Sequence, residues 1–263
     1  APRDLFIADG KIVGMGSAPA GFTAARSIDA SGLVVAPGLI DLAARLREPG
    51  FEYKATLESE MDAAMAGGVT SLAIPPDTDP VLDEPGLVEM LCYRAKKLNR
   101  AHVYPVGALT IGLKGEQLSE MAELVEAGCV AFSQANTPIL DTRVLSRAMQ
   151  YAATFGFRVW LQPLDPYLAR GGVAHDGEVA SRLGLPGIPA SAEIVALYTY
   201  LRLARQTGAR LHITRLSCAE SLDLIEQARR DGVDVSCDVA AHHLHLCDMD
   251  IGYFRSEERR VGK

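Results

Sequence analysis

Short runs of consecutive apolar residues alternate with longer amphipathic segments through most of the chain. Seven runs rich in β-branched residues have the length of strands buried on both faces; they cover residues 39–42, 69–74, 103–109, 129–132, 157–161, 211–216 and 233–239. Six intervening segments repeat apolar residues at three- and four-residue spacing, which predicts helices; they cover residues 55–66, 85–98, 116–126, 142–154, 192–206 and 219–230. This alternation predicts an α/β fold with a parallel sheet.

The start of the chain has a different pattern. Apolar residues flank the dipeptide Asp9-Gly10, which favours the type I′ turn of a tight β-hairpin. A second strand pair is expected at 26–28 and 33–35. We therefore predict that residues 1–36 belong to a small N-terminal β domain, part of a β-sandwich.

The alternating region, residues 37–254, is predicted to form a (β/α)8 TIM-type barrel. Such barrels need about 250 residues, and the pattern ends after its seventh strand, so we expect a barrel truncated before the eighth. An open doubly wound sheet is the alternative, but no Gly-x-Gly-x-x-Gly turn follows an early strand. Residues 255–263 (RSEERRVGK) form an atypical charged tail, either solvated or an artificial end.

Composition narrows the function classes. Of the 263 residues, 48% are hydrophobic and 22% are charged, as in ordinary soluble globular proteins. No apolar run approaches the roughly 20 residues that span a bilayer, and no signal peptide is visible. A net charge of −7 argues against nucleic-acid binding. Five scattered cysteines predict reduced thiols and a cytoplasmic protein.

In a parallel barrel the reactive groups lie at the carboxyl ends of the strands. Sequence motifs at those places resemble the dihydroorotases of the amidohydrolase superfamily, in order and spacing, from residue 4 to about 250. The matching segments are VAPGLID (35–41), LREPG (46–50), GGVT (67–70), GCVAFS (128–133) and Gly177-Glu178. The resemblance implies an amidohydrolase barrel and, in active members, hydrolysis of a cyclic amide by a water that one or two zinc ions activate.

The first strand of this family carries Asp-x-His-x-His, and residues two apart on a strand face the same side. Here the two histidine positions are Ala43 and Arg45. A methyl group cannot bind a metal, and a guanidinium is a cation without an acceptor. The metal-ligand motif is therefore degenerate at both positions.

The other ligand positions that the resemblance identifies are also replaced. The family's carboxylate after the fourth strand is Gln134, its histidine after the fifth is Gln162, and its histidine after the sixth is Arg215. The catalytic aspartate belongs to an eighth strand that is not expected in this chain. We predict no catalytic residue, no metal ligand and the loss of zinc.

The substrate-binding positions are partly retained. Arg47 stands where the family grips the substrate carboxylate, but Asp79 replaces an asparagine and would repel that carboxylate. Arg45, Arg47 and Arg215 could together bind an anion. The alternative is that Arg45 and Arg215 form ion pairs with Asp41 or Asp79 inside a plugged barrel mouth.

The remaining histidines and cysteines are more ordinary. His243 and His245 have metal-like spacing at the end of the seventh strand, but the family has a similar run there that does not bind zinc. We interpret them as structural, His175 as solvated and His212 as a core group or a group that supports the site from behind. Cys129 and Cys237 are expected to be small buried hydrophobes.

The departures from the family motif favour a catalytically inactive dihydroorotase-like protein. The resemblance then implies a structural subunit for the catalytic chain of aspartate carbamoyltransferase in pyrimidine biosynthesis, within an oligomeric assembly. Two alternatives remain open. One is an active zinc-dependent dihydroorotase or other cyclic-amide hydrolase with a relocated metal near Asp238 or His212, and the other is an anion sensor.

Overall fold

The computed structural model describes residues 3–252. Among them, residues up to Gly38 form one compact unit and residues from Leu39 onward form a second. The first unit contains an antiparallel hairpin of β1 (Leu5–Ala8) and β2 (Lys11–Met15). Asp9 and Gly10 join the strands with φ of 51° and 71°, the left-handed pair of a type I′ turn. The predicted hairpin is therefore confirmed.

The second strand pair predicted in the first unit is wrong. Residues 26–28 and 33–35 lie outside regular secondary structure. Val34 is 92% exposed, and a turn closes where the Leu33 N–H donates to the Ala30 carbonyl at 3.0 Å. A strand is stabilised by the neighbour with which it pairs, so apolar residues alone do not produce one here.

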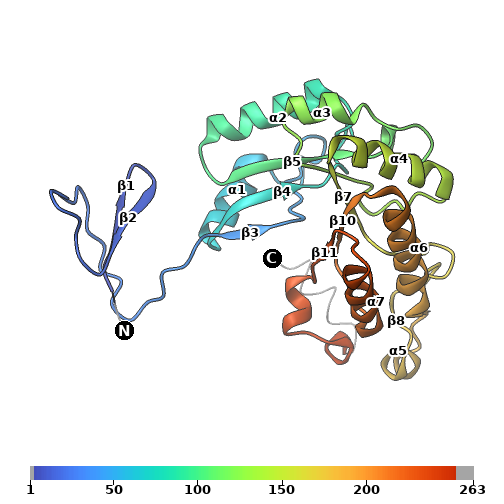
Figure 1. Cartoon of the computed structure of the whole chain (residues 1–263). Coiled ribbons are helices and arrows are strands. Elements are labelled where there is room, and N and C mark those ends of the chain that lie inside the picture. The colour runs from blue at the N-terminus through green and yellow to red at the C-terminus, as the bar shows by residue number, and fades with distance from the viewer. Residues whose placement is uncertain (1–2, 253–263) are drawn as a thin grey trace. The chain divides into compact units, whose positions relative to one another are not determined.

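The second unit is built on one parallel sheet of seven strands. Its members are β3 (Leu39–Asp41), β4 (Val69–Ile74), β5 (His102–Ala108), β6 (Ala131–Ser133), β7 (Arg158–Leu161), β10 (Arg210–Ile213) and β11 (Val235–Cys237). Each strand pairs with the next one of the sheet along the chain, in the order β11-β10-β7-β6-β5-β4-β3. The sheet curls in one direction, as in a barrel wall (Figure 1). This order confirms the barrel-type sheet and excludes the doubly wound alternative.

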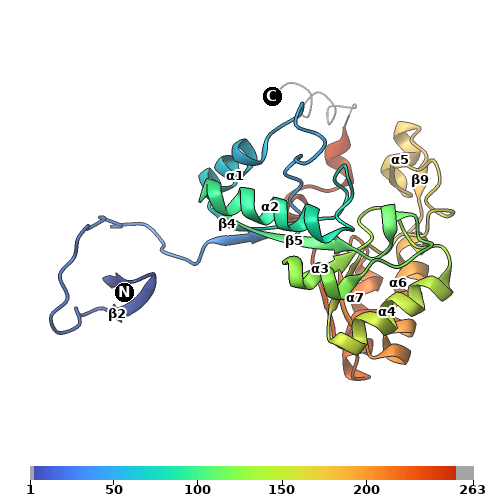
Figure 2. The same cartoon turned by 90° about the horizontal axis from the view of Figure 1, so that it is seen from above.

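All six predicted helices are present, and they lie along the outer face of the sheet (Figure 2). They are α1 (Leu57–Ala66), α2 (Pro85–Leu98), α3 (Met121–Ala127), α4 (Thr142–Phe155), α6 (Ser191–Thr207) and α7 (Ala219–Arg230). Thr56 begins α1 with a capping box, and Pro85 begins α2 at the position that tolerates proline. Between helices and strands lies one continuous core that includes Leu57, Phe132 and Leu145.

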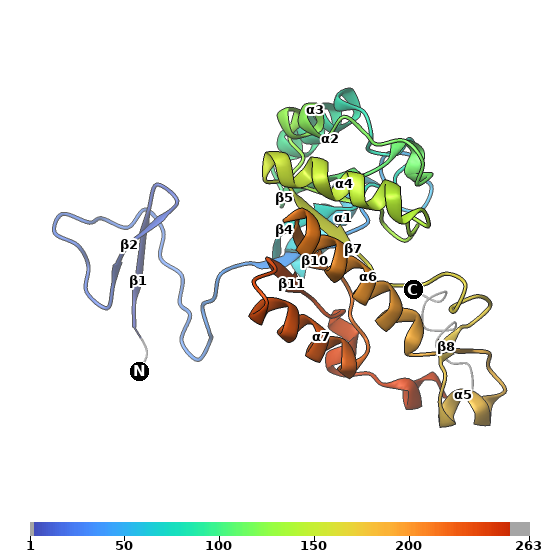
Figure 3. The same ribbon diagram turned by 45° about the vertical axis from the view of Figure 1, so that its right-hand side comes forward.

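Several short elements are missing from the sequence prediction. A long connection between β7 and α6 contains β8 (Ala174–His175), α5 (Glu178–Leu183) and β9 (Gly187–Ile188) (Figure 3). Single turns of 3₁₀ helix also form, namely η1 (Ile111–Leu113), η2 (Ala241–Leu244) and η3 (Asp248–Ile251). Two-residue strands and single turns are too short to leave a periodic pattern.

None of the helices among residues 3–252 has the length and apolar character to cross a membrane. The predicted tail, residues 255–263, lies outside the described residues.

Candidate functional site at the carboxyl ends of the strands

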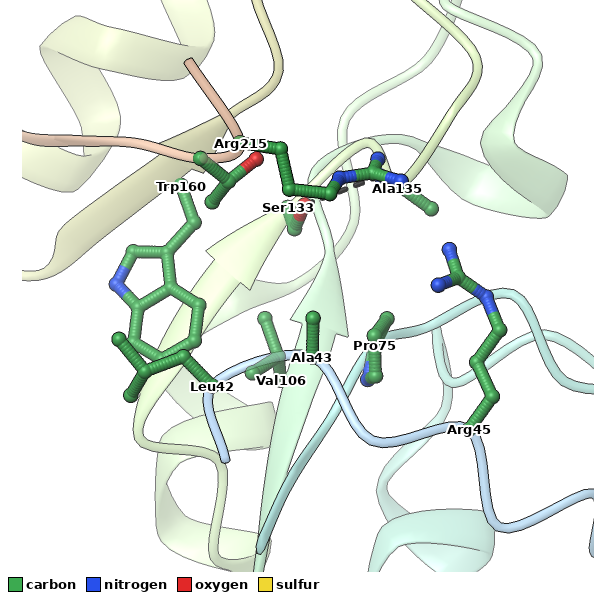
Figure 4. A pocket seen from close by; sticks show the side chains of 10 residues that line it. Leu42, Ala43, Arg45, Pro75, Val106, Ser133, Ala135, Trp160 and Arg215 are labelled. Atoms are coloured by element: carbon green, nitrogen blue, oxygen red, sulfur yellow. Dashed lines mark hydrogen bonds between the residues drawn. The ribbon is translucent and has the colours of Figure 1, made fainter. Parts of the chain in front are cut away.

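The carboxyl ends of the sheet surround a small pocket. Its walls come from several strand ends and include Ala43, Arg45, Ser133, Trp160 and Arg215 (Figure 4). The cavity volume is about 20 Å³, which is space for one or two water molecules. The pocket therefore lies where a barrel enzyme has its active site, but it cannot enclose a substrate ring as it stands.

Arg45 is held by two acceptors that follow other strands. Its Nε donates to Asp77 Oδ2 at 2.8 Å, and its Nη2 donates to Asn136 Oδ1 at 3.3 Å. The predicted ion pair of Arg45 with Asp41 or Asp79 is wrong, since its carboxylate partner is Asp77. The connection after β4 brings Asp77 to the pocket, while Asp79 is exposed.

The guanidinium of Arg215 donates hydrogen bonds only to neutral side chains among residues 3–252. One of its terminal nitrogens donates to Asn136 Oδ1 and also to Gln162 Oε1. The predicted ion pair of Arg215 with Asp41 or Asp79 is also wrong, because the salt bridges among residues 3–252 include Arg45 with Asp77 but none to Arg215. The same asparagine thus lies between two guanidinium groups.

The backbone conformation of Arg215 sets the position of its side chain, and the groups around the guanidinium set its pKa. A φ of 58° places the residue in the left-handed region, and its N–H donates to Asp238 Oδ1 at 2.6 Å. Burial lowers the pKa of Arg215, and the charge of Arg45 lowers it further, although Asp238 and Asp77 act in the opposite direction. The guanidinium is therefore a partly desolvated cation beside a second cation.

Gln134 is turned into the protein and does not line the pocket. It is only 2% exposed, and its amide nitrogen donates to Thr110 Oγ1 at 2.8 Å. Its amide oxygen lies 3.1 Å from the same hydroxyl. Ala135, which follows, has a φ of 50° and lines the pocket instead. Both polar ends of Gln134 are thus occupied by one buried threonine.

A histidine–aspartate pair lies on the last two strands of the sheet. His212 Nε2 is 3.0 Å from Asp238 Oδ2, and His212 Nδ1 is 2.9 Å from Ser236 Oγ. The histidine ring lies 5.2 Å from the Trp160 ring, centre to centre. Because His212 is 6% exposed with both nitrogens partnered, the interpretation as a core group is confirmed.

The Asp238 carboxylate is contacted through both of its oxygens. Burial raises its pKa, but the hydrogen bond from His212, the Arg215 N–H and the charges of these residues together bring the pKa below its ordinary value. The carboxylate is therefore ionised at neutral pH, with both oxygens already occupied by protein groups.

The other predicted candidates lie apart from the pocket. His243 and His245 are exposed in and after η2, and His175 is exposed at the end of β8. Arg47, with a φ of 64°, is exposed and does not line the pocket. Within residues 3–252, no group of three or more His, Cys, Asp or Glu side chains could hold a metal ion.

The cysteines of the described residues are all free thiols. Cys129 is buried as predicted, and burial together with Cys92 raises its pKa to about 12. Cys237 is partly buried against the core. Raised pKa values and burial make structural thiols unreactive.

Sequence reasoning did not identify two residues that organise the pocket. Asn136 accepts from both arginines, and Asp77 accepts from one of them. Both are short polar residues one to three positions beyond a strand-end segment, which is a usable signal in a parallel barrel.

A third missed residue lies behind the pocket. Glu193 is 6% exposed and accepts from the backbone N–H groups of Ser217 and Cys218, at 2.9 and 3.1 Å. It also accepts from the hydroxyls of Ser217 and Ser221. The carboxylate holds the turn that begins two residues beyond Arg215 and leads into α7. A lone glutamate within a helix gives no such signal in a sequence.

Comparison with known proteins identifies the family. A family model described as dihydro-orotase-like matches residues 32–221. The chain belongs to the dihydro-orotase-like family. A "dihydroorotase-like protein" of Pseudomonas aeruginosa is 50% identical over 253 residues, which cover 96% of this chain and 60% of that protein. A "dihydroorotase" of Pelotomaculum thermopropionicum is 45% identical over 253 residues, covering 95% of this chain and 58% of that protein.

Solved structures confirm the fold of this dihydroorotase-like chain. The L-hydantoinase (dihydropyrimidinase) of Arthrobacter aurescens aligns with a TM-score of 0.79 at 21% identity, covering 95% of this chain and 57% of that one. A dihydroorotase of Saccharomyces cerevisiae, in complex with 5-fluoroorotic acid, aligns with a TM-score of 0.59 at 17% identity, covering 83% and 60%. This chain spans about three fifths of the length of its curated relatives.

The zinc ions that the family resemblance implies do not fit the donor groups of this dihydroorotase-like chain. Ala43 has no donor atom, and Arg45 and Arg215 present cations. The amide of Gln134 is occupied by Thr110, and the amide oxygen of Gln162 accepts from Arg215. A catalytic zinc needs about three protein ligands, which these five positions do not provide.

Proposed function

We propose that this dihydroorotase-like chain is catalytically inactive and serves as a structural subunit for the catalytic chain of aspartate carbamoyltransferase in pyrimidine biosynthesis. One observation carries the proposal. The polar side chains at the family's ligand positions contact each other and their neighbours, as Arg45, Arg215 and Gln162 do around Asn136. The amide oxygens of Gln134 and Gln162, which are the metal-binding atoms left at these positions, are also used in hydrogen bonds within the protein.

Electrostatics supports the loss of zinc. A guanidinium about 5 Å from a divalent ion would repel it by roughly 5–7 kcal/mol at an effective dielectric near 20. Arg45 and Arg215 both line the pocket, whereas Asp77 offsets only the first of them by direct contact. The proposal therefore includes no zinc and no other cofactor at this site.

The names of the relatives are divided between two descriptions. Two Pseudomonas proteins, at 50% and 49% identity, carry the name "dihydroorotase-like protein", whereas the Pelotomaculum relative at 45% identity is named "dihydroorotase". Free thiols in the described residues suit a reducing compartment, so we place the proposed complex in the cytoplasm. Its oligomeric assembly is part of the same proposal.

Metal content and partner binding test the proposal in one preparation. The chain is expressed with the aspartate carbamoyltransferase catalytic chain of the same organism, captured through a tag on either component and assayed for zinc. We expect the two chains to co-purify in a fixed ratio, with far less than one zinc per dihydroorotase-like chain and no turnover of carbamoyl aspartate.

An active dihydroorotase passed through the same purification is the control for zinc retention. About one zinc per chain, together with turnover, would reverse the proposal in favour of a cyclic-amide hydrolase. A zinc-free chain that does not bind the transferase would leave the inactivity standing and remove the scaffold role.

A further inference from the structure

The two guanidinium groups of the pocket have one carboxylate in direct contact, while Asp77 and Asp238 stabilise the charge of Arg215 from a greater distance. Arg45 pairs with Asp77, but the side chain of Arg215 contacts only the neutral oxygens of Asn136 and Gln162. Arg45 Nη1 and Arg215 Nε and Nη1 have no protein acceptor within residues 3–252. Two cations thus face one cavity with donor groups still available.

The apolar walls of the pocket strengthen the attraction between the two guanidinium groups and an anion. Leu42, Pro75 and Val106 line it beside the arginines, and Figure 4 shows both guanidinium groups extending beyond these apolar side chains. Charges interact more strongly where water is partly excluded. A guanidinium is also weakly hydrated, which favours its use in partly buried anion sites.

We propose that one small monovalent anion, of the size of chloride or formate, binds in this pocket between the guanidinium groups of Arg45 and Arg215. This goes beyond the scaffold function and does not depend on a partner chain. The anion offsets the repulsion between the two cations and accepts from their unoccupied N–H groups.

Size and neighbouring charge determine the class of anion. A cavity of about 20 Å³ holds one or two waters, so an anion that it encloses must be small. Asp77, whose buried Oδ1 has no hydrogen-bond partner among the described residues, faces Arg45 and repels an anion from that side. Asp238 has both oxygens occupied, by His212 and by the Arg215 backbone. The anion therefore lies closer to Arg215, and a single negative charge suffices.

The same groups explain why the pocket favours an anion over water alone. Burial and the charge of Arg45 lower the pKa of Arg215, which means that the folded protein disfavours its charge. A bound anion reverses this penalty, because an opposite charge stabilises the protonated guanidinium. Folding and anion binding are thus linked.

The test is thermal unfolding of the full chain in sodium chloride, sodium formate and sodium gluconate at equal ionic strength. An anion at ten times its Kd shifts the folding equilibrium about elevenfold, which raises Tm by about 3–6 °C for a chain of this size. We expect a saturable rise with chloride or formate, and none with the bulky gluconate. A response to only one of the two identifies the anion.

Two variants separate this site from general salt effects. Arg215→Gln is expected to lose the saturable rise, and Arg215→Lys to keep a weaker one. Arg202→Gln is the matched control, since Arg202 is exposed on α6, outside the pocket. Equal responses in Arg215→Gln and Arg202→Gln, or no saturable response in the unmodified chain, would overturn the proposal.

A structural measurement covers the case in which Arg215→Gln does not fold. Crystals of the unmodified chain, soaked in bromide, are expected to give anomalous density between Arg45 and Arg215. Density only elsewhere would refute the site. Density there without a saturable response in solution would mean an adventitious ion only. Neither result bears on zinc content or transferase binding, which test the scaffold function separately.

Discussion

Phe132 and Asn136 are four residues apart, yet they belong to regions with different physical character. Phe132 has no exposed surface and lies in the core beneath the helices, among Leu, Met and Ala side chains. Asn136 is exposed and accepts from two arginines at the mouth of the same sheet. The core is stabilised by burial of apolar area, which does not depend on what the strand ends carry. A barrel can therefore keep its fold while its site changes.

The largest effect is expected from a substitution that leaves a cavity in the core. Leu145 on α4 is 1% exposed, so Leu145→Ala is expected to lower the free energy of unfolding by about 2–5 kcal/mol. Leu222 on α7 is 48% exposed, and Leu222→Ala should change it by less than about 1 kcal/mol. Urea denaturation measures both, and equal losses would show that the core does not carry the fold.

A smaller loss of the free energy of unfolding is expected from a change at the carboxyl ends of the strands. Asn136→Leu removes the acceptor shared by Arg45 and Arg215 and leaves two cations side by side. Hydrogen bonds to charged groups contribute about 1.5–3 kcal/mol when buried, and the exposure of Asn136 reduces this to about 1–2 kcal/mol. Thr137→Leu, at the next exposed position of the loop, is the control. A similar loss in both variants would argue against a specific role for the asparagine.

Much of the fold follows from local patterns, because apolar runs and amphipathic periods are properties of a few adjacent residues. Helices α2 and α7 begin and end where the periodicity places them. The unpaired segment at 33–35 shows the limit, since strand formation there depends on a partner that the local sequence does not specify.

At the site, too, some features could be predicted from the sequence and others could not. Replacement of metal ligands at Ala43 and Arg45 could be identified by comparison with a family motif, because both positions directly follow the matching segment VAPGLID (35–41). The partners of the arginines could not be predicted. Left-handed backbone at Ala135 and Arg215 directs the side chains around the pocket, and such turns leave no periodic signal.

The smallest expected effect concerns pH. The pKa of Asp238 lies below its ordinary value in the folded chain, so the stability that it contributes is complete above its unfolded pKa of about 3.9. That stability is lost as the pH falls through the lower folded pKa, because the unfolded state then binds more protons. Asp238→Asn should make the acid-side loss of the free energy of unfolding shallower.

Asp223→Asn is the matched control, because Asp223 is exposed on α7. It should leave the pH profile of the free energy of unfolding nearly unchanged between about pH 6 and pH 3. If Asp238→Asn and the control have the same profile, the ionised carboxylate does not help to hold the end of β11 against Arg215. The pocket would then be held by the contacts of Asn136, Asp77 and Gln162 with the two arginines, and its contrast with the core would be sharper.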